Sequence, residues 1–118
     1  MQFGLLGVNF KDAPLDIRDK ASFTEAGKLE FFQKAAEAGA VQCMVLSTCN
    51  RSEVFYLYEE TGDGSVAGKL RRIYQGMFPE AALEGYLREL EGKEAMAYLF
   101  RITAGLESLV LGEDQILG

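Results

Sequence analysis

The chain has 118 residues, a net charge of −6 and no histidine, and these values exclude several classes of function. The length suits one domain with a real core, and a hydrophobic fraction of 48% is ordinary for a soluble globular protein. The acidic balance argues against a domain that holds nucleic acid by itself, because phosphate binding relies on Lys and Arg. Without histidine, and with 2 separated cysteines, the chain has almost no ligands for zinc, and we expect no metal.

The sequence also bears on cellular location. No run of about 18 apolar residues occurs, so we expect no membrane-spanning helix. The opening residues lack a basic leader and their apolar stretch ends at Lys11, so we do not expect a signal peptide. Cys43 and Cys49 would lie about 20 Å apart on one extended segment, which is too far for a disulfide. Reduced thiols fit the cytoplasm, which is the location we predict.

The first part of the chain predicts one strand followed by helices. Residues 2–9 are short and apolar and read as a buried strand. A short helix is expected over residues 14–23, where Pro14 suits the first turn. A longer helix is expected over residues 25–38, with its N-cap either at Ser22 in a capping box or at Thr24. The residues expected on the inward face of that helix are Leu29, Phe32, Ala35 and Ala36.

Two β-rich runs at residues 41–47 and 52–59 predict a hairpin whose loop holds the most interesting local chemistry. Cys43 falls inside the first strand, and free cysteine is among the most buried residue types, so we assign it to the core. Cys49 falls in the loop, where an ordinary turn and a reactive thiol are both possible. Arg51 favours the second possibility, because a nearby cation stabilises a thiolate and a guanidinium pairs with carboxylates.

The second part of the chain completes the predicted fold. Residues 66–77 have apolar side chains at helical spacing, with a turn expected at residues 61–64 before them. Residues 85–91 fit a strand or a helix, and residues 93–106 predict a final helix. With a strand at 85–91, the chain is α+β: a ferredoxin-like β-α-β-β-α-β sandwich followed by a C-terminal helix. The expected inward residues are Val66, Leu70, Ile73, Tyr74 and Met77 in one helix, and Ala95, Leu99 and Ile102 in the other.

Two further patterns are weak by themselves. "GEDQ" (112–115) places two carboxylates and an amide after an apolar run, which is usually the solvated end of a helix or loop. "GLLGVN" contains Gly-x-x-Gly but not the G-x-G-x-x-G of a dinucleotide site. Neither pattern alone predicts a function.

"LSTCNRSEVF" and "GLESLVLGEDQILG" together resemble the N-terminal catalytic domain of glutamyl-tRNA reductase. "GVNFKDAPLDIRDKASF" also resembles the amino-terminal "NHKTAP…IRE" segment of that family. The resemblance covers essentially the whole chain. It implies that residues 1–118 form the catalytic domain that recognises the glutamate of glutamyl-tRNA, and that the NADPH-binding and dimerisation domains are not present in this chain.

The resemblance assigns roles to individual residues. Cys49 is implied as the nucleophile that attacks the aminoacyl ester and forms a glutamyl thioester, which NADPH would reduce to glutamate-1-semialdehyde in the first step of the C5 route to tetrapyrroles. Arg51 is implied as the partner of the glutamyl side-chain carboxylate. The full set of implied substrate-binding residues is Thr48, Asn50, Arg51, Ser108, Glu113, Asp114 and Gln115.

The chain departs from the family pattern at two histidines. Phe10 stands in the segment that reads "NHK" in the family, and Tyr98 stands at the position of a histidine implicated in activity. A tyrosine with a pKa near 10 is a poor base at neutral pH, although it can donate a proton or a hydrogen bond. These departures keep an alternative open, a non-catalytic relative that acts as a binding or regulatory domain. A thiol redox protein is a third possibility, but the chain lacks C-x-x-C.

The family resemblance also implies partners. Glutamyl-tRNA(Glu) would be the substrate, and glutamate-1-semialdehyde aminomutase would be a protein partner. The full-length protein would be a homodimer. The fragment alone would carry thioester formation and not reduction.

Overall fold

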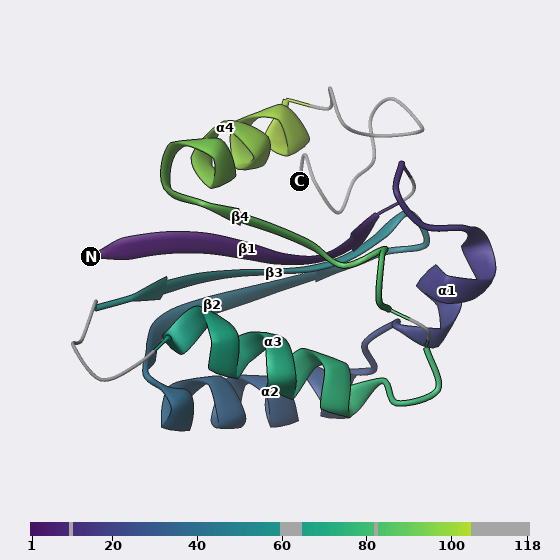
Figure 1. Ribbon diagram of the computed structural model, residues 1–118, viewed down its shortest axis with the longest axis horizontal. Coiled ribbons are helices and arrows are strands. Elements are labelled where there is room, and N and C mark those ends of the chain that lie inside the picture. Colours follow the sequence, from purple (N-terminus) through teal and green to yellow (C-terminus); the bar gives the residue numbers. More distant parts are fainter. Residues whose placement is uncertain (10, 60–64, 82, 105–118) are drawn as a thin grey trace.

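The computed structural model describes residues 1–9, 11–59, 65–81 and 83–104. Four strands form one sheet, and four helices flank it within the described ranges (Figure 1). The strands are β1 (Gln2–Asn9), β2 (Ala40–Ser47), β3 (Arg51–Tyr58) and β4 (Arg88–Glu91); the helices are α1 (Leu15–Lys20), α2 (Glu25–Ala38), α3 (Val66–Met77) and α4 (Gly92–Thr103).

The sheet confirms the ferredoxin-like prediction. Its strand order is β2-β3-β1-β4, and every neighbouring pair is antiparallel. The ambiguous segment 85–91 contributes strand β4, at one edge of the sheet. In the central pair, Asn9 lies opposite Arg51 and Gly7 lies opposite Glu53. This register brings the end of β1 beside the start of β3.

Helices cover both faces of the sheet, with α2 and α3 on one side and α4 on the other (Figure 1). Successive residues of a strand point to opposite faces, so Leu5 and Phe55 pack in the cluster under α4, whereas Leu6 and Val54 pack under α2 and α3. The cluster under α4 has few members: Leu5, Phe55, Ala95, Tyr98 and Ile102.

Helix α2 has the predicted bounds but a different inward face. Its N-cap is Thr24, whose Oγ1 accepts a hydrogen bond from the Gly27 backbone N–H at 2.9 Å. The buried residues are Phe31 and Ala35, whereas Leu29 is 65% exposed. Ala36 is also exposed and Phe32 is half-buried, so the predictions of Leu29 and Ala36 as inward residues were wrong. Phe31 lies inward because its ring packs edge-on against Phe23 at 5.7 Å, a contact that sequence spacing does not reveal.

The other helix predictions fared better. In α3, Val66, Leu70 and Tyr74 are buried, and the remaining two expected residues are half-buried. In α4, Ala95 and Ile102 are buried as expected. Tyr98 is buried as well, although it was not among the residues expected on the inward face of this helix. The turn at 61–64 and residues 105–106 lie outside the described residues.

Candidate active site

Cys49 lies in a short loop between the end of β2 and the start of β3, and its side chain is exposed. The Thr48 backbone N–H donates to the Arg51 carbonyl at 2.7 Å and closes the loop. The Asn50 N–H donates to Thr48 Oγ1 at 3.1 Å, and Cys49 Sγ lies 3.8 Å from Asn50 Oδ1. The thiol is therefore presented to solvent by a turn whose backbone is held by hydrogen bonds.

Helix α1 holds this loop from outside the hairpin. Arg18 Nη1 donates to the carbonyl oxygen of Cys49 at 3.0 Å. The Ser52 hydroxyl, just past the loop, donates to the Ala21 carbonyl at the end of α1. These contacts join residues that are 31 positions apart in the chain. The position of the thiol thus depends on α1 as well as on the hairpin.

Directly after the loop lies a fully buried polar cluster formed by Asn9, Arg51, Glu53 and Tyr98, called the buried tetrad below. Arg51 Nη1 contacts Glu53 Oε1 at 3.1 Å and donates to the Tyr98 hydroxyl at 3.0 Å. The Tyr98 hydroxyl donates to Glu53 Oε2 at 2.6 Å, and Asn9 Nδ2 donates to Tyr98 at 3.0 Å. The side chains of the Arg51–Glu53 ion pair both have 0% exposure. Arg51 is thus already paired with a carboxylate in this conformation.

The electrostatics of the tetrad follow from its burial. Burial raises the pKa of Glu53, and the hydrogen bond from Tyr98 and the charge of Arg51 oppose that rise. Burial also raises the pKa of the Tyr98 hydroxyl, and the neighbouring Glu53 charge raises it further. Tyr98 therefore stays protonated at neutral pH and serves the cluster as a hydrogen-bonding hydroxyl.

Strand alternation and a glycine explain how the tetrad fits inside the protein. Arg51 and Glu53 are two residues apart on β3, so both point to the α4 face, where Tyr98 lies. Gly7 stands opposite Glu53 on β1. A Cβ at Gly7 would overlap the backbone of β3, at the Ser52 carbonyl oxygen and 2.6 Å from Glu53 Cα, and would lie 2.8 Å from Glu53 Cγ. The glycine of "GLLGVN" therefore allows β1 to approach β3 closely at the position of Glu53.

The ring of Tyr98 is held by two further cations. The Arg88 Cζ atom lies 5.1 Å from the ring centroid and the Arg101 Cζ atom lies 5.9 Å from it. Both distances fall in the range of cation–π interactions. These contacts orient the ring, and with it the hydroxyl that joins α4 to the tetrad.

The structure brings together some of the predicted site residues. Thr48, Cys49 and Asn50 form the loop, with Asn50 buried. Arg51 and Tyr98 are in direct contact, although they are 47 residues apart in the chain. The remaining predicted residues lie outside the described residues: Ser108, Glu113, Asp114 and Gln115.

Three residues of this site were not predicted from the sequence: Asn9, Arg18 and Glu53. Glu53 carried a usable signal, because a carboxylate two positions after Arg51 inside an apolar strand needs a buried partner. Asn9 ends the first strand, and its Oδ1 accepts the backbone N–H groups of Lys11 and Asp12 at 2.9 and 3.2 Å. Arg18 carried no local signal, since its contact depends on how α1 folds back.

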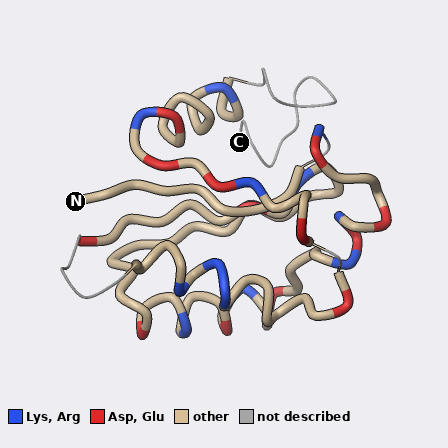
Figure 2. Tube along the Cα trace, viewed as in Figure 1, with Lys and Arg blue, Asp and Glu red and all other residues tan. Residues whose placement is uncertain are grey.

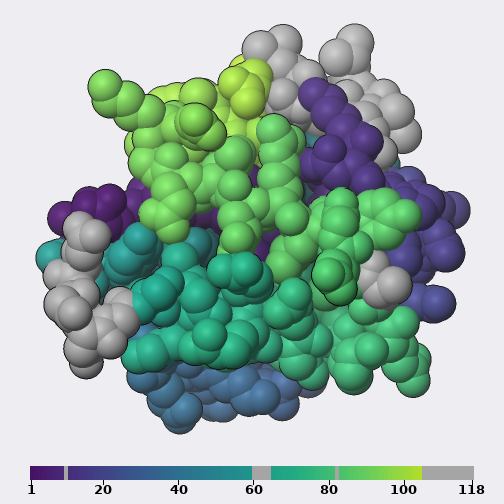
Figure 3. All heavy atoms as spheres, in the orientation of Figure 1, coloured from purple at the N-terminus to yellow at the C-terminus, as the bar shows by residue number. Residues whose placement is uncertain are grey.

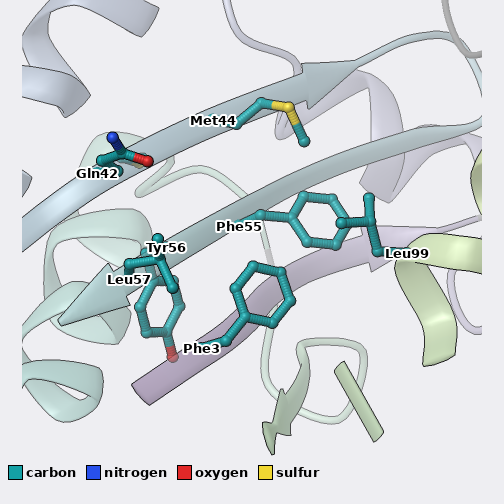
Figure 4. A pocket seen from close by; sticks show the side chains of 8 residues that line it. Phe3, Gln42, Met44, Phe55, Tyr56, Leu57 and Leu99 are labelled. Atoms are coloured by element: carbon teal, nitrogen blue, oxygen red, sulfur yellow. The ribbon is translucent and has the colours of Figure 1, made fainter. Parts of the chain in front are cut away.

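The other cysteine lies in an apolar environment. Cys43 is half-buried, and burial raises its pKa to about 12. It borders a hollow of about 210 Å³ on the sheet surface, whose other walls include Phe3, Phe55 and Leu99 (Figure 4). The Phe3 and Phe55 ring centroids are 6.1 Å apart. None of the described residues that line this hollow is charged, so these walls are a poor match for a charged substrate.

The described residues offer no evident place for a metal or a dinucleotide. No group of three or more His, Cys, Asp or Glu in the described ranges could hold a metal ion. The two glycines of "GLLGVN" lie within β1, where a Cβ at Gly4 would fall 2.6 Å from Tyr56 Cε2. That space is filled by side chains, so it cannot cradle a pyrophosphate. No helix in the described part of the chain is both long and apolar enough to cross a bilayer.

Comparison with known proteins gives consistent matches along the chain. Residues 6–118 match the family described as "Glutamyl-tRNAGlu reductase, N-terminal domain". The chain is 39% identical over 122 residues to a glutamyl-tRNA reductase from Alkaliphilus metalliredigens, a match that covers 100% of this chain and 28% of that relative. It is 40% identical over 119 residues to one from Geobacillus thermodenitrificans, covering 100% of this chain and 26% of the relative.

Among solved structures, glutamyl-tRNA reductase from Methanopyrus kandleri is similar, with a TM-score of 0.64 and 26% sequence identity. The match covers 97% of this chain and 25% of that structure. The chain therefore spans about a quarter of the length of the relatives it matches.

Proposed function

The chain belongs to the family of glutamyl-tRNA reductase N-terminal domains, and from this membership we propose that Cys49 accepts the glutamyl group from glutamyl-tRNA. The whole reaction would be the reduction of glutamyl-tRNA(Glu) to glutamate-1-semialdehyde, which feeds tetrapyrrole synthesis. The part of that reaction assigned to this chain is formation of the thioester.

The observation that carries the proposal is the exposed thiol of Cys49 in a loop fixed from two sides. Arg18 holds the Cys49 carbonyl at 3.0 Å from α1. Arg51, two residues further on, is held by Glu53 and Tyr98 under α4. A nucleophile gains most when its position is set before the substrate arrives, because the enzyme then avoids the entropy cost of ordering it.

The proposed step is an acyl transfer. The Cys49 thiolate attacks the carbonyl carbon of the aminoacyl ester, a carbon–sulfur bond forms, and the bond from that carbon to the ribose oxygen breaks. The leaving ribose oxygen takes one proton. Only the thiolate is nucleophilic, so the thiol must first lose its own proton. We assign neither proton transfer to a described residue.

The tetrad supports a positioning role for Tyr98 rather than a role as a base. Its hydroxyl stays protonated at neutral pH and is already bonded to Asn9, Arg51 and Glu53. Direct contact between Tyr98 and the leaving group stays a prediction. Contact between Arg51 and the substrate also stays a prediction. The guanidinium would have to bind the substrate carboxylate while it is paired with Glu53, or release Glu53 in order to bind it.

The remaining contacts of the proposal concern the loop and the last part of the chain. Thr48 and Asn50 would contact the glutamyl group beside the thiol. Ser108 and residues 113–115 would complete the glutamate site.

The proposal for the whole protein includes NADPH, a homodimer, and glutamate-1-semialdehyde aminomutase as a partner. The β1 glycines do not fit a dinucleotide, since Gly4 is packed against the Tyr56 side chain and Gly7 against the β3 backbone. We therefore assign no part of the reduction to them. The cytoplasm is the proposed location.

The test is to trap the acyl group. The full-length protein is incubated with glutamyl-tRNA carrying labelled glutamate, without NADPH, and the label is located by mass spectrometry of peptides. We expect a thioester on Cys49 that is absent in Cys49→Ser. Cys43→Ser is the matched control and should still be labelled.

The same experiment separates the alternatives. A wild-type protein that binds glutamyl-tRNA but never becomes labelled would favour a non-catalytic binding or regulatory domain, which the replacement of two family histidines by Phe10 and Tyr98 motivates. Modification of Cys49 by oxidants alone, with no acyl adduct, would favour a thiol redox protein.

A further inference from the structure

Helix α3 carries a local excess of positive charge, in contrast to the chain as a whole. Helix α3 has three basic residues, Lys69, Arg71 and Arg72, and no acidic residue along its 12 positions. The whole chain has a net charge of −6. Figure 2 shows this helix with blue segments and without red ones. Helix α3 thus carries a local positive charge that the net charge of the chain did not reveal.

These side chains border a groove between two helices. Lys34 of α2 and Lys69 and Arg72 of α3 line a groove of about 530 Å³. Ile73 and Gly76 also line the groove, and a Cβ at Gly76 would meet no described atom within 4 Å. Helices α2 and α3 lie side by side on the surface away from α4 (Figure 3). The groove is therefore open to a large ligand.

The cations of the groove are largely available to a ligand. Among the described residues, neither Lys69 nor Arg72 has a carboxylate within ion-pair distance, whereas Arg71 points away and pairs with Glu89 at 3.1 Å. Lys34 lies 3.8 Å from Glu30, but both side chains are at least half exposed, so this pair is weak. Glu37 also lines the groove and reduces its net charge. Within the described part of the chain, the groove therefore has two cations without a carboxylate partner and one that is loosely paired.

We propose that this groove binds the phosphate backbone of the RNA part of the substrate. The proposal rests on the proposed function, in which Cys49 takes an acyl group that is covalently attached to RNA. Lys69 and Arg72 are three residues apart, or about 4.5 Å along the helix axis. Lys34 lies across the groove, and packed helices are about 8–10 Å apart. Phosphates follow one another by about 3.4 Å per strand along a duplex axis, so cations at these spacings can contact several of them.

The position of the groove fits an RNA better than a small anion. The groove adjoins the start of β2 through Ala38, whereas Cys49 follows the end of β2. The eight residues of β2 separate the two places by about 26 Å. A single phosphate could not occupy both places. A polynucleotide whose acylated 3′ end reaches the thiol can extend that far over the surface of the helical layer.

The test compares an RNA acyl donor with a small one in the full-length protein. The variants are the double substitution Lys69→Gln/Arg72→Gln and the control Lys93→Gln, which removes one exposed cation from α4 on the other side of the sheet. Acylation of Cys49 is followed with labelled glutamyl-tRNA and, separately, with a glutamate ester of a small alcohol.

We expect the double substitution to raise the KM for glutamyl-tRNA about tenfold near 0.1 M salt, and to lower the salt dependence of tRNA binding by about two phosphate contacts. Acylation by the small ester should be unchanged, and the control should match wild type with both donors. Equal loss with both donors would overturn the proposal in favour of a structural role. An unchanged KM together with an unchanged salt dependence would also overturn the proposal. An acidic protein would then be the better candidate ligand of the groove.

Failure of the proposed function gives a different result. If no donor acylates Cys49 in the wild-type protein, the proposed function fails. RNA binding by the groove is then tested only by equilibrium binding of tRNA without an amino acid. The double substitution should still weaken this binding about tenfold.

Discussion

Replacing Arg51 with methionine should destabilise the protein in a pH-dependent manner. The substitution removes the cation of an ion pair whose side chains both have 0% exposure, and it leaves the Glu53 carboxylate buried. Breaking a buried pair by removing one partner costs about 3–5 kcal/mol. The carboxylate keeps its hydrogen bonds to Tyr98 at 2.6 Å and to Asn9 at 3.4 Å. We therefore expect the lower end of the range, about 3 kcal/mol at pH 8.

The pH dependence follows from the proton affinity of Glu53. Burial raises its pKa, and Arg51 opposes that rise through its charge and its hydrogen bond. Without Arg51 the pKa of Glu53 in the folded protein rises further above its value in the unfolded chain. The folded variant therefore binds a proton at a pH where the unfolded chain does not. Its stability is then highest below the unfolded value of about 4.3 and is lost as pH increases through the raised pKa. The cost should therefore be smaller at pH 5 than at pH 8.

Urea denaturation at pH 8 and pH 5 measures both values. Adding Glu53→Gln to Arg51→Met should restore about 2 kcal/mol at pH 8, because the buried charge is gone. Lys34→Met is the control, since it removes a cation from an exposed pair and should cost less than about 1 kcal/mol at either pH. A cost for Arg51→Met that is equal at both pH values, or a further loss from the second substitution, would refute this account of the tetrad.

Three other predictions concern the same end of the sheet. Gly7→Ala should lower stability by about 1–3 kcal/mol and slow acylation of the thiol, because its Cβ would overlap the Ser52 carbonyl oxygen and lie 2.6 Å from Glu53 Cα on the neighbouring strand; an unchanged melting temperature would contradict this. Tyr98→Phe should cost about 1–3 kcal/mol in urea denaturation, because buried partners lose a hydrogen bond, and a neutral result would show that the hydroxyl is dispensable. Iodoacetamide at pH 8, followed by mass spectrometry, should label Cys49 long before Cys43, whose pKa is raised to about 12; equal rates would show that burial does not protect the second thiol.

The fold could be predicted from the sequence where the signals were local. The strand lengths, the hairpin and the bounds of α2 follow from runs of apolar residues and from Thr24 as a cap. The inward face of α2 could not be predicted, because several apolar residues compete for it and the contact between Phe23 and Phe31 decides the outcome. The segment 85–91 had both patterns, and its pairing with β1 made it a strand.

In the site, too, the local features could be predicted from the sequence and the contacts between distant residues could not. The loop around Cys49 is continuous in sequence, so it could be recognised directly. The tetrad could not, because Asn9, Glu53 and Tyr98 come from β1, β3 and α4, and only the strand register brings them together. The reason for Gly7 was equally hidden: a dinucleotide motif was the obvious test for that glycine, whereas its neighbour across the sheet explains it.

The loop that carries the thiol is held by hydrogen bonds that connect it to two helices, α1 and α4. Arg18 ties it to α1 at one side, and Arg51 ties its far end to Tyr98 of α4 at the other. Among the described residues, the cluster under α4 has fewer buried side chains than the cluster under α2 and α3. A shift of α4 along the sheet would move the Tyr98 hydroxyl, and through Arg51 it would change the direction in which the thiol points. The loop that holds the exposed thiol of Cys49 is thus connected through Arg51 and Tyr98 to α4, the last described helix.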